Sequence, residues 1–231
     1  MRQLRSGVVT VAGLLLLSAS ARAADPEPPA GVKVDKAKRT VTIDAKVAPR
    51  QLAYLKGEIY PIEVIACWPH PRGKKAHETI VTIEAKPSEV HKALESLGLK
   101  PGKPVMGESK DVPQGPEVNV YIEVPREGGK ARRVPVERTL LDPKTGRPMP
   151  KVKWRFTGSV MSQADPSKPE KTYGADLTGT LIAIFPVTDQ TVLQTNLTMK
   201  EEKYLKLETD KKILPKEGAP VKLVIEVPAA K

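Results

Sequence analysis

The sequence has few residues of the kinds that supply covalent bridges, cluster ligands or stacking surfaces. Its 231 residues include one cysteine, Cys67, two Phe, two Trp and five Tyr. A single cysteine cannot form an internal disulfide, and it falls short of the roughly four thiolates that an iron–sulfur cluster needs. The scarcity of aromatic residues, together with the lack of a nucleic-acid-binding motif, argues against a nucleic-acid partner.

Motifs of the common enzyme classes are also absent. The chain contains no nucleophile-elbow motif, no phosphate-binding P-loop, no Gly-rich dinucleotide turn and no evident pair of catalytic carboxylates. We therefore expect a protein without an identifiable catalytic motif, and an enzyme is the less favoured interpretation.

Only one apolar run is long, and it lies near the N-terminus. A basic start precedes the apolar residues 8–17, and Ala21, Arg22 and Ala23 follow as a small-x-small cleavage site. This pattern predicts a secretory signal peptide over residues 1–23 and hence an exported protein, periplasmic or secreted. The run is too short to span a bilayer, so we expect no transmembrane segment after cleavage. Residues 24–31 form a Pro-rich spacer, and residues 32–231 are predicted to form one domain.

The remaining chain is basic. Removing the three arginines of residues 1–23 lowers the formal net charge from +11 to +8. The basic residues look distributed, in short loop runs such as residues 36–39, 72–75 and 128–133. Most are expected to be ordinary solvated side chains, and a mildly cationic surface of an exported protein favours anionic envelope polymers or acidic proteins as partners.

Short β-type segments dominate the pattern of hydrophobic residues. They are rich in β-branched residues or alternate apolar and polar positions, and they lie at residues 32–34, 39–47, 60–67, 77–84, 117–125, 153–158, 177–185 and 221–228. Helical turns are expected near residues 136–141, 188–193 and 200–206. We predict an α+β fold, mostly antiparallel β-sheet with a few short helices and long Pro/Gly-rich loops.

The stretch from residue 59 to residue 98 holds Cys67 and all three histidines, His70, His77 and His91. Its two β-type segments flank a Pro/Gly-rich connection, which favours an antiparallel hairpin. Symmetric closure would set Cys67 opposite His77, whereas a slip of one residue would set it opposite Glu78 or Ala76. A helix is expected to begin at Pro87 or Ser88 and to end at Gly98, with His91 at the border of its apolar stripe.

Three uses of these side chains follow. Cys67, His77 and His91 carry ligand atoms that suit zinc or copper, and His70 would add a fourth. Alternatively, a Cys67–His77 dyad would activate the thiol, while Glu78, next along the strand, would point to the opposite face. The third interpretation, which we favour, is that His77 bonds a carbonyl or carboxylate and fixes the loop.

Two further features each allow two interpretations. Trp154 is either a stacking surface in a ligand groove or, as we favour, a core residue. Residues 115–125 and 218–228 match without gaps at several positions, which indicates either a duplicated β-unit or, the safer interpretation, two similar strands between Pro/Gly turns.

Six segments together resemble the YdjY-domain family of exported bacterial proteins: residues 61–66, 73–79, 85–105, 140–149, 154–159 and 175–183. The resemblance extends from about Leu52 to the C-terminus and implies a YdjY-like domain behind a signal peptide, without implying an activity or a cofactor. The positions that carry the family's motifs are His77, Glu78, His91, Gly98, Trp154, Gly158 and Ser159. A ferredoxin-like label attached to some relatives does not transfer, because Cys67 is alone.

We therefore expect an exported binding or structural module of the bacterial cell envelope. One alternative is a small metal-binding or redox protein that uses Cys67, His77 and His91. The other is a cysteine-dependent enzyme.

Overall fold

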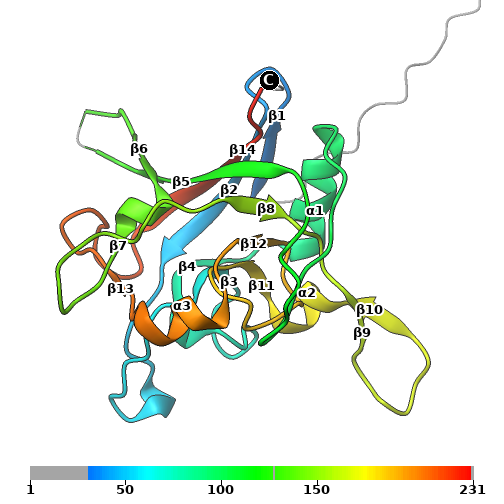
Figure 1. Cartoon of the computed structure of the whole chain (residues 1–231). Coiled ribbons are helices and arrows are strands. Elements are labelled where there is room, and N and C mark those ends of the chain that lie inside the picture. The colour runs from blue at the N-terminus through cyan, green and yellow to red at the C-terminus, as the bar shows by residue number, and fades with distance from the viewer. Residues whose placement is uncertain (1–30, 127, 230–231) are drawn as a thin grey trace, which may run out of the picture.

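The strands close into a barrel in the computed structural model, which describes residues 31–126 and 128–229 (Figure 1). Each strand pairs with the next around the ring, and the last returns to the first. In this order the strands are β2 (Thr40–Val47), β14 (Pro220–Glu226), β5 (Glu117–Val124), β8 (Trp154–Phe156), β12 (Leu193–Thr195), β11 (Thr180–Ala183), β3 (Val64–Cys67) and β4 (Thr79–Ile83). Two of the pairs, β3–β4 and β11–β12, are parallel, and the others are antiparallel.

The predicted α+β fold is therefore wrong in its architecture. The structure is mostly β, as the sequence indicated, but a plain antiparallel sheet with helices does not describe it. The pairing of β2 with β4 closes the sheet on itself, and closure removes the unpaired edges that a plain sheet would expose. The helices are short: α1 (Pro87–Ser96), α2 (Gly174–Thr178) and α3 (Met199–Tyr204).

Short elements surround the ring. Strand β1 (Val32–Asp35) extends β2, and β6 (Arg132–Pro135) extends β5. Outside the ring, β9 (Met161–Gln163) pairs with β10 (Lys171–Tyr173), and β7 (Leu140–Leu141) pairs with β13 (Glu208–Thr209). Three 3₁₀ turns lie at Ala53–Leu55, Ala76–Glu78 and Val136–Thr139.

Alternation along the longer strands fills the barrel. In β2 the buried residues Val41, Ile43, Ala45 and Val47 alternate with residues that include exposed Asp44 and Lys46, so that one face joins the core and the other meets solvent. Strand β5 repeats the pattern. Strands β3 and β11 are buried at every residue, as expected of strands that are covered on both faces.

The predicted hairpin between residues 60–67 and 77–84 is wrong. Strands β3 and β4 run parallel, and their register places Cys67 beside Thr82 rather than beside His77. Antiparallel strand β11 forms the other neighbour of β3, with Thr180 beside Cys67. Residues 68–78 therefore make a crossover connection, and His77 lies in the 3₁₀ turn that precedes β4.

Several local predictions are confirmed. Strands β1 and β2 form the expected first hairpin, and α1 spans the predicted helix. Gly98 follows α1 with φ +88°, the left-handed conformation that ends many helices. The helical turn predicted at 188–193 is wrong, because this segment consists of bends that lead into β12. The predicted signal peptide and the spacer up to residue 30 lie outside the described residues.

The two similar segments of the sequence are neighbours in the barrel. Strands β5 and β14 pair antiparallel, with Tyr121 opposite Val224. This placement fits both interpretations of their similarity. Among the helices of the described residues, none is long and apolar enough to cross a membrane.

Candidate functional site

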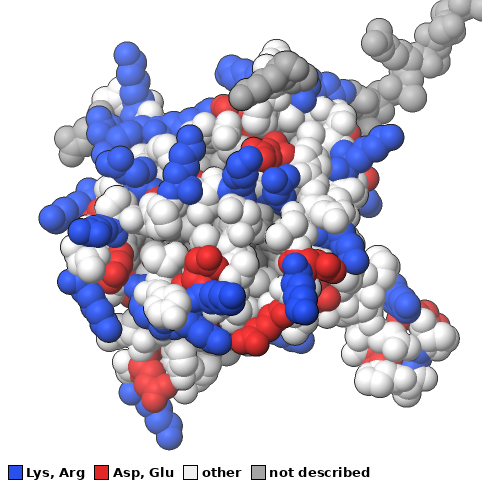
Figure 2. Space-filling model, viewed as in Figure 1, with Lys and Arg blue, Asp and Glu red and all other residues white. Residues whose placement is uncertain are grey.

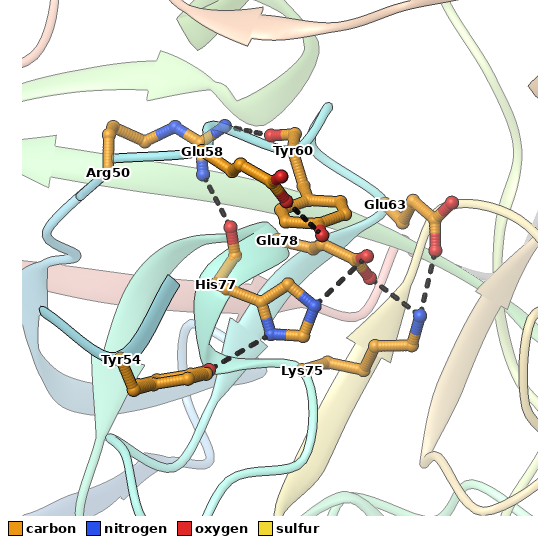
Figure 3. Close-up of polar contacts among 8 residues, drawn as sticks. All are labelled: Arg50, Tyr54, Glu58, Tyr60, Glu63, Lys75, His77 and Glu78. Carbon is orange, nitrogen blue, oxygen red and sulfur yellow. Dashed lines mark hydrogen bonds and ion pairs between the residues drawn. The ribbon is translucent and has the colours of Figure 1, made fainter. Parts of the chain in front are cut away.

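A charged network surrounds His77 and Glu78 at the start of β4 (Figure 3). His77 Nε2 lies 3.2 Å from Glu78 Oε1, and Lys75 Nζ lies 2.6 Å from Glu78 Oε2. The same ammonium lies 3.0 Å from Glu63 Oε2 on the segment that leads into β3. One lysine therefore joins two carboxylates, and His77 contacts one of them.

The partial burial of this network shifts its pKa values. Burial raises the pKa of Glu63, and the neighbouring Glu78 adds to the rise while Lys75 opposes it. Burial acts to lower the pKa of Lys75, but the hydrogen bond to Glu78 and the charge of Glu63 outweigh it, so that the pKa is raised. The lysine therefore stays charged and holds the two carboxylates together.

Arg50 fixes the loops beside this network. Its guanidinium donates to the carbonyl of His77 (2.8 Å) and to the carbonyl of Tyr60, and it pairs with Glu208 on β13. The Arg50 side chain is only 6% exposed. Although burial acts in the opposite direction, the bonds from Arg50 and from the backbone of Thr209 lower the pKa of Glu208. This buried cation makes four hydrogen bonds, two to Glu208 and two to backbone carbonyls, so it serves as an anchor.

Aromatic rings cover the network on its solvent side. The Tyr54 ring stacks on His70, with a centroid distance of 4.3 Å, and Tyr60 meets His77 edge-on at 5.2 Å. The Tyr54 hydroxyl lies 3.4 Å from His77 Nδ1 and joins the two pairs. Tyr60 donates to Glu58 (2.7 Å), and this bond raises the pKa of its phenol.

The structure places His77 as the favoured interpretation described: its imidazole contacts the Glu78 carboxylate and fixes the loop. The expectation that Glu78 points away from His77 is wrong, because both residues lie in a 3₁₀ turn rather than in an extended strand.

A second group of family-motif residues meets around His91 on α1. Its Nδ1 lies 2.7 Å from the Tyr173 hydroxyl, and this hydroxyl also accepts the backbone N–H of Ser159 (3.1 Å). The Ser159 hydroxyl in turn accepts the N–H of Ala175 at the start of α2 (3.0 Å). Burial raises the pKa of Tyr173, which keeps the phenol protonated.

Gly158 allows this group to pack. It has φ +65°, and a Cβ atom there would lie 2.8 Å from Pro101 Cβ and 3.3 Å from His91 Cε1. The His91 ring meets Phe156 edge-on at 4.9 Å and thus borders the core, as predicted. The group ties α1, α2 and the loop after β8 together, which is a structural role.

Cys67 lies apart from the histidines. Its thiol is buried, 4.0 Å from the Thr178 carbonyl, and burial raises its pKa. Within residues 31–126 and 128–229, no group of three or more His, Cys, Asp or Glu residues is placed to hold a metal ion. The structure does not bring together Cys67, His70, His77 and His91, the residues of the predicted metal site.

Trp154 is a core residue, as favoured. It is buried, and its indole N–H donates to Glu137 (2.8 Å). The motif positions thus divide among the network at His77 and Glu78, the group at His91, Gly158 and Ser159, the end of α1 at Gly98 and the core at Trp154.

The basic residues are less evenly distributed than predicted. Residues 126–153, called the basic segment here, contain nine Lys or Arg and three Asp or Glu. They run from the end of β5 through β6 and β7 to the start of β8, and blue side chains gather over this region on the left of Figure 2. Six of its cations are exposed and have no ion pair among the described residues: Arg126, Lys130, Arg138, Lys144, Arg147 and Lys151.

Sequence reasoning missed several of these residues. The density of Lys and Arg in the basic segment was available from a count over a sliding window. Arg50, Tyr54 and Tyr173 carry no local signal, because their partners are 10 to 158 residues distant in the chain.

Comparison with known proteins gives one match. The family model described as the YdjY domain matches residues 32–226, which covers the whole barrel. No curated protein and no solved structure matches the chain.

Proposed function

The chain belongs to the YdjY-domain family, and on that premise we propose that it is an exported binding module of the bacterial cell envelope that holds an anionic polymer through its basic segment. Export is inferred from the signal-peptide pattern of residues 1–23. The observation that carries the proposal is the set of six exposed cations that form no ion pair with a carboxylate of residues 31–126 or 128–229.

Unpaired surface cations raise the local concentration of anions around them, and they lose no existing ion pair when a polyanion arrives. Some exposed cations of the molecule are already paired across strands: Lys222 contacts Asp44, and within the basic segment Arg133 pairs with both Glu123 and Glu226. Single exposed lysines without a described ion pair also lie elsewhere on the surface, but the basic segment concentrates six such cations between residues 126 and 151. This density of positive charge is what the segment offers to a ligand.

A flexible polymer suits this region better than an acidic protein does. Stable protein interfaces have an apolar centre from which water is excluded. The exposed large hydrophobic residues of the described chain include none between residues 126 and 153. The basic segment offers charge without such a centre, which favours binding through many separate ionic contacts.

A pair of matched polymers tests the proposal. Dextran sulfate and dextran share a backbone and differ in charge, and binding of the protein to each is measured by calorimetry at low and high salt. The proposal predicts binding to dextran sulfate that weakens as salt rises, and no binding to dextran. Equal binding to both polymers, or binding to neither, would contradict it.

Export is tested separately by expressing the full chain with its own N-terminus in a bacterial host. The proposal predicts a processed protein in the envelope or the medium, with a new N-terminus at Ala24. An unprocessed protein in the cytoplasm would contradict this part of the proposal.

A further inference from the structure

We propose that the rings of Tyr54, Tyr60, His70 and His77, the ring platform, bind an uncharged sugar residue. The platform lies on the loops before β3 and between β3 and β4, whereas the basic segment lies between β5 and β8. The inference therefore goes beyond the proposed polyanion binding and does not depend on it.

The first argument is the concentration of exposed rings. Two of the five tyrosines and two of the three histidines of the chain meet here. Tyr54 is 47% exposed and Tyr60 is 37% exposed. Exposed large rings that gather in one place mark an interaction surface, since scattered ones are the ordinary case.

The second argument is the geometry of the rings. Tyr54 stacks on His70 with an interplanar angle of 24°, so one face of the tyrosine is covered while about half of its surface remains accessible. Tyr60 and His77 are nearly perpendicular, at 80°. Through the contact of the Tyr54 hydroxyl with His77, the two pairs form one continuous surface.

The third argument is the polar rim. The platform is bordered by two phenol hydroxyls, by the Glu58 carboxylate and by the imidazole of His77, which together both donate and accept hydrogen bonds (Figure 3). A pyranose ring has an apolar face of C–H groups and a rim of hydroxyls. An aromatic ring with a polar edge complements both parts of such a ligand.

The platform is also held in place before any ligand arrives. Arg50 donates hydrogen bonds to the backbone carbonyls of Tyr60 and His77. Glu78 contacts the His77 ring and is itself held by Lys75. Because these loops are already ordered in the free protein, little conformational entropy is lost when a ligand binds.

Charge indicates that the ligand is uncharged. The carboxylates of Glu58, Glu63 and Glu78 lie around the rings, and Lys75 is already paired with two of them. An anionic group on the platform would meet these carboxylates. The site thus differs in ligand class from the basic segment.

The test is an NMR titration of the ¹³C-labelled protein with triacetylchitotriose, an uncharged trisaccharide. Saturable shifts are expected for the ring signals of Tyr54, Tyr60, His70 and His77. The Tyr54→Ala variant should weaken binding by about three- to tenfold, as expected for the loss of one ring contact. The control is Tyr204→Ala, because Tyr204 is 83% exposed and lies on α3; its affinity should equal that of the wild type.

Two further variants separate the ring face from the rim. His70→Leu removes the ring that stacks on Tyr54, and Tyr60→Phe removes the hydroxyl that donates to Glu58. Each variant should bind the trisaccharide more weakly, while its amide spectrum remains that of a folded protein. The absence of saturable ring shifts in the wild-type protein would overturn the inference. The same result is expected if these rings bind a partner protein instead of a sugar. Equal weakening in Tyr204→Ala would also overturn it. Because the probe is uncharged, either result leaves the dextran sulfate experiment to decide the proposed function.

Discussion

Arg50 and Glu208 are 158 residues apart in the sequence, and their side chains form a two-point ion pair with N–O distances of 2.8 and 3.2 Å. The same guanidinium bonds the carbonyls of Tyr60 and His77. One buried cation therefore joins β13 to both loops that carry the ring platform. The position of the platform on the barrel depends on this residue.

Replacing Arg50 by Gln should destabilise the protein by about 3 kcal/mol, because Glu208 and the backbone carbonyls of Tyr60 and His77 lose their donor. Urea unfolding measures the change, with Arg138→Gln as the control. Arg138 is exposed and forms no ion pair with a residue that the structure describes, so this variant should stay within about 0.5 kcal/mol of the wild type. Equal unfolding midpoints for the two variants would show that Arg50 is not an anchor.

The pair also predicts a dependence on pH. The folded-state pKa of Glu208 is lowered from its ordinary value of 4.5, so the ionised carboxylate stabilises the fold above that value. This stabilisation is lost as the pH falls through the lowered pKa. Glu208→Gln should therefore be less stable than the wild type at neutral pH, and the difference should shrink as the pH falls below 4.5. A difference that stays constant between neutral and strongly acidic solution would contradict the assignment.

Gly158 and Gly146 provide a matched pair for the packing around His91. Both have similar positive φ angles, +65° and +68°, but only Gly158 faces other atoms within 4 Å. Substitution by Ala carries a similar backbone penalty of about 1 kcal/mol at each. Gly158→Ala should lose a further 1–3 kcal/mol, roughly, because its Cβ would contact Pro101 and His91. Thermal unfolding of both variants measures the difference, and equal losses would contradict close packing at Gly158.

Cys67 should be inert in the folded protein. Its thiol is buried and burial raises its pKa, so the reactive thiolate is disfavoured. A chromogenic disulfide reagent at mildly alkaline pH should modify no thiol in native protein and one thiol per chain in denaturant. Rapid modification of the native protein would return the cysteine-dependent chemistry to consideration.

Local patterns predicted the local structure. The apolar stripe before Gly98 indicated α1, and the alternation of residues 39–47 and 117–125 indicated β2 and β5. These features depend on residues close in the chain, and the physical cause of each acts over one turn or one pleat.

Long-range pairing could not be predicted in the same way. Strand β3 has β4 as a parallel neighbour on one edge, and its neighbour on the other edge, β11, comes from more than a hundred residues later in the chain. Closure of the barrel depends on β2 having two different partners on one edge, β1 for its first half and β4 for its second. Nothing in the sequence of β2 marks where one partner gives way to the other.

The candidate sites show the same division. The motif residues of the family were identified, but their partners were not, because His91 meets Tyr173 at a separation of 82 residues. The scarcity of aromatic residues predicted no stacking platform, yet folding brings Tyr54 onto His70. The uneven charge of the basic segment was present in the sequence and was overlooked among shorter basic runs.

The most direct test of polyanion binding compares two variants of equal net charge. One replaces by Gln the six exposed cations of the basic segment that have no ion pair in the described part of the chain: Arg126, Lys130, Arg138, Lys144, Arg147 and Lys151. The other replaces six exposed lysines elsewhere, Lys74, Lys92, Lys100, Lys110, Lys171 and Lys200, by Gln. The affinity of each for dextran sulfate at low salt is the measurement. We predict that the first variant loses binding by at least about tenfold while the second stays within about threefold of the wild type. Equal losses in both would show that net charge alone governs binding, and would contradict a polymer site on the basic segment.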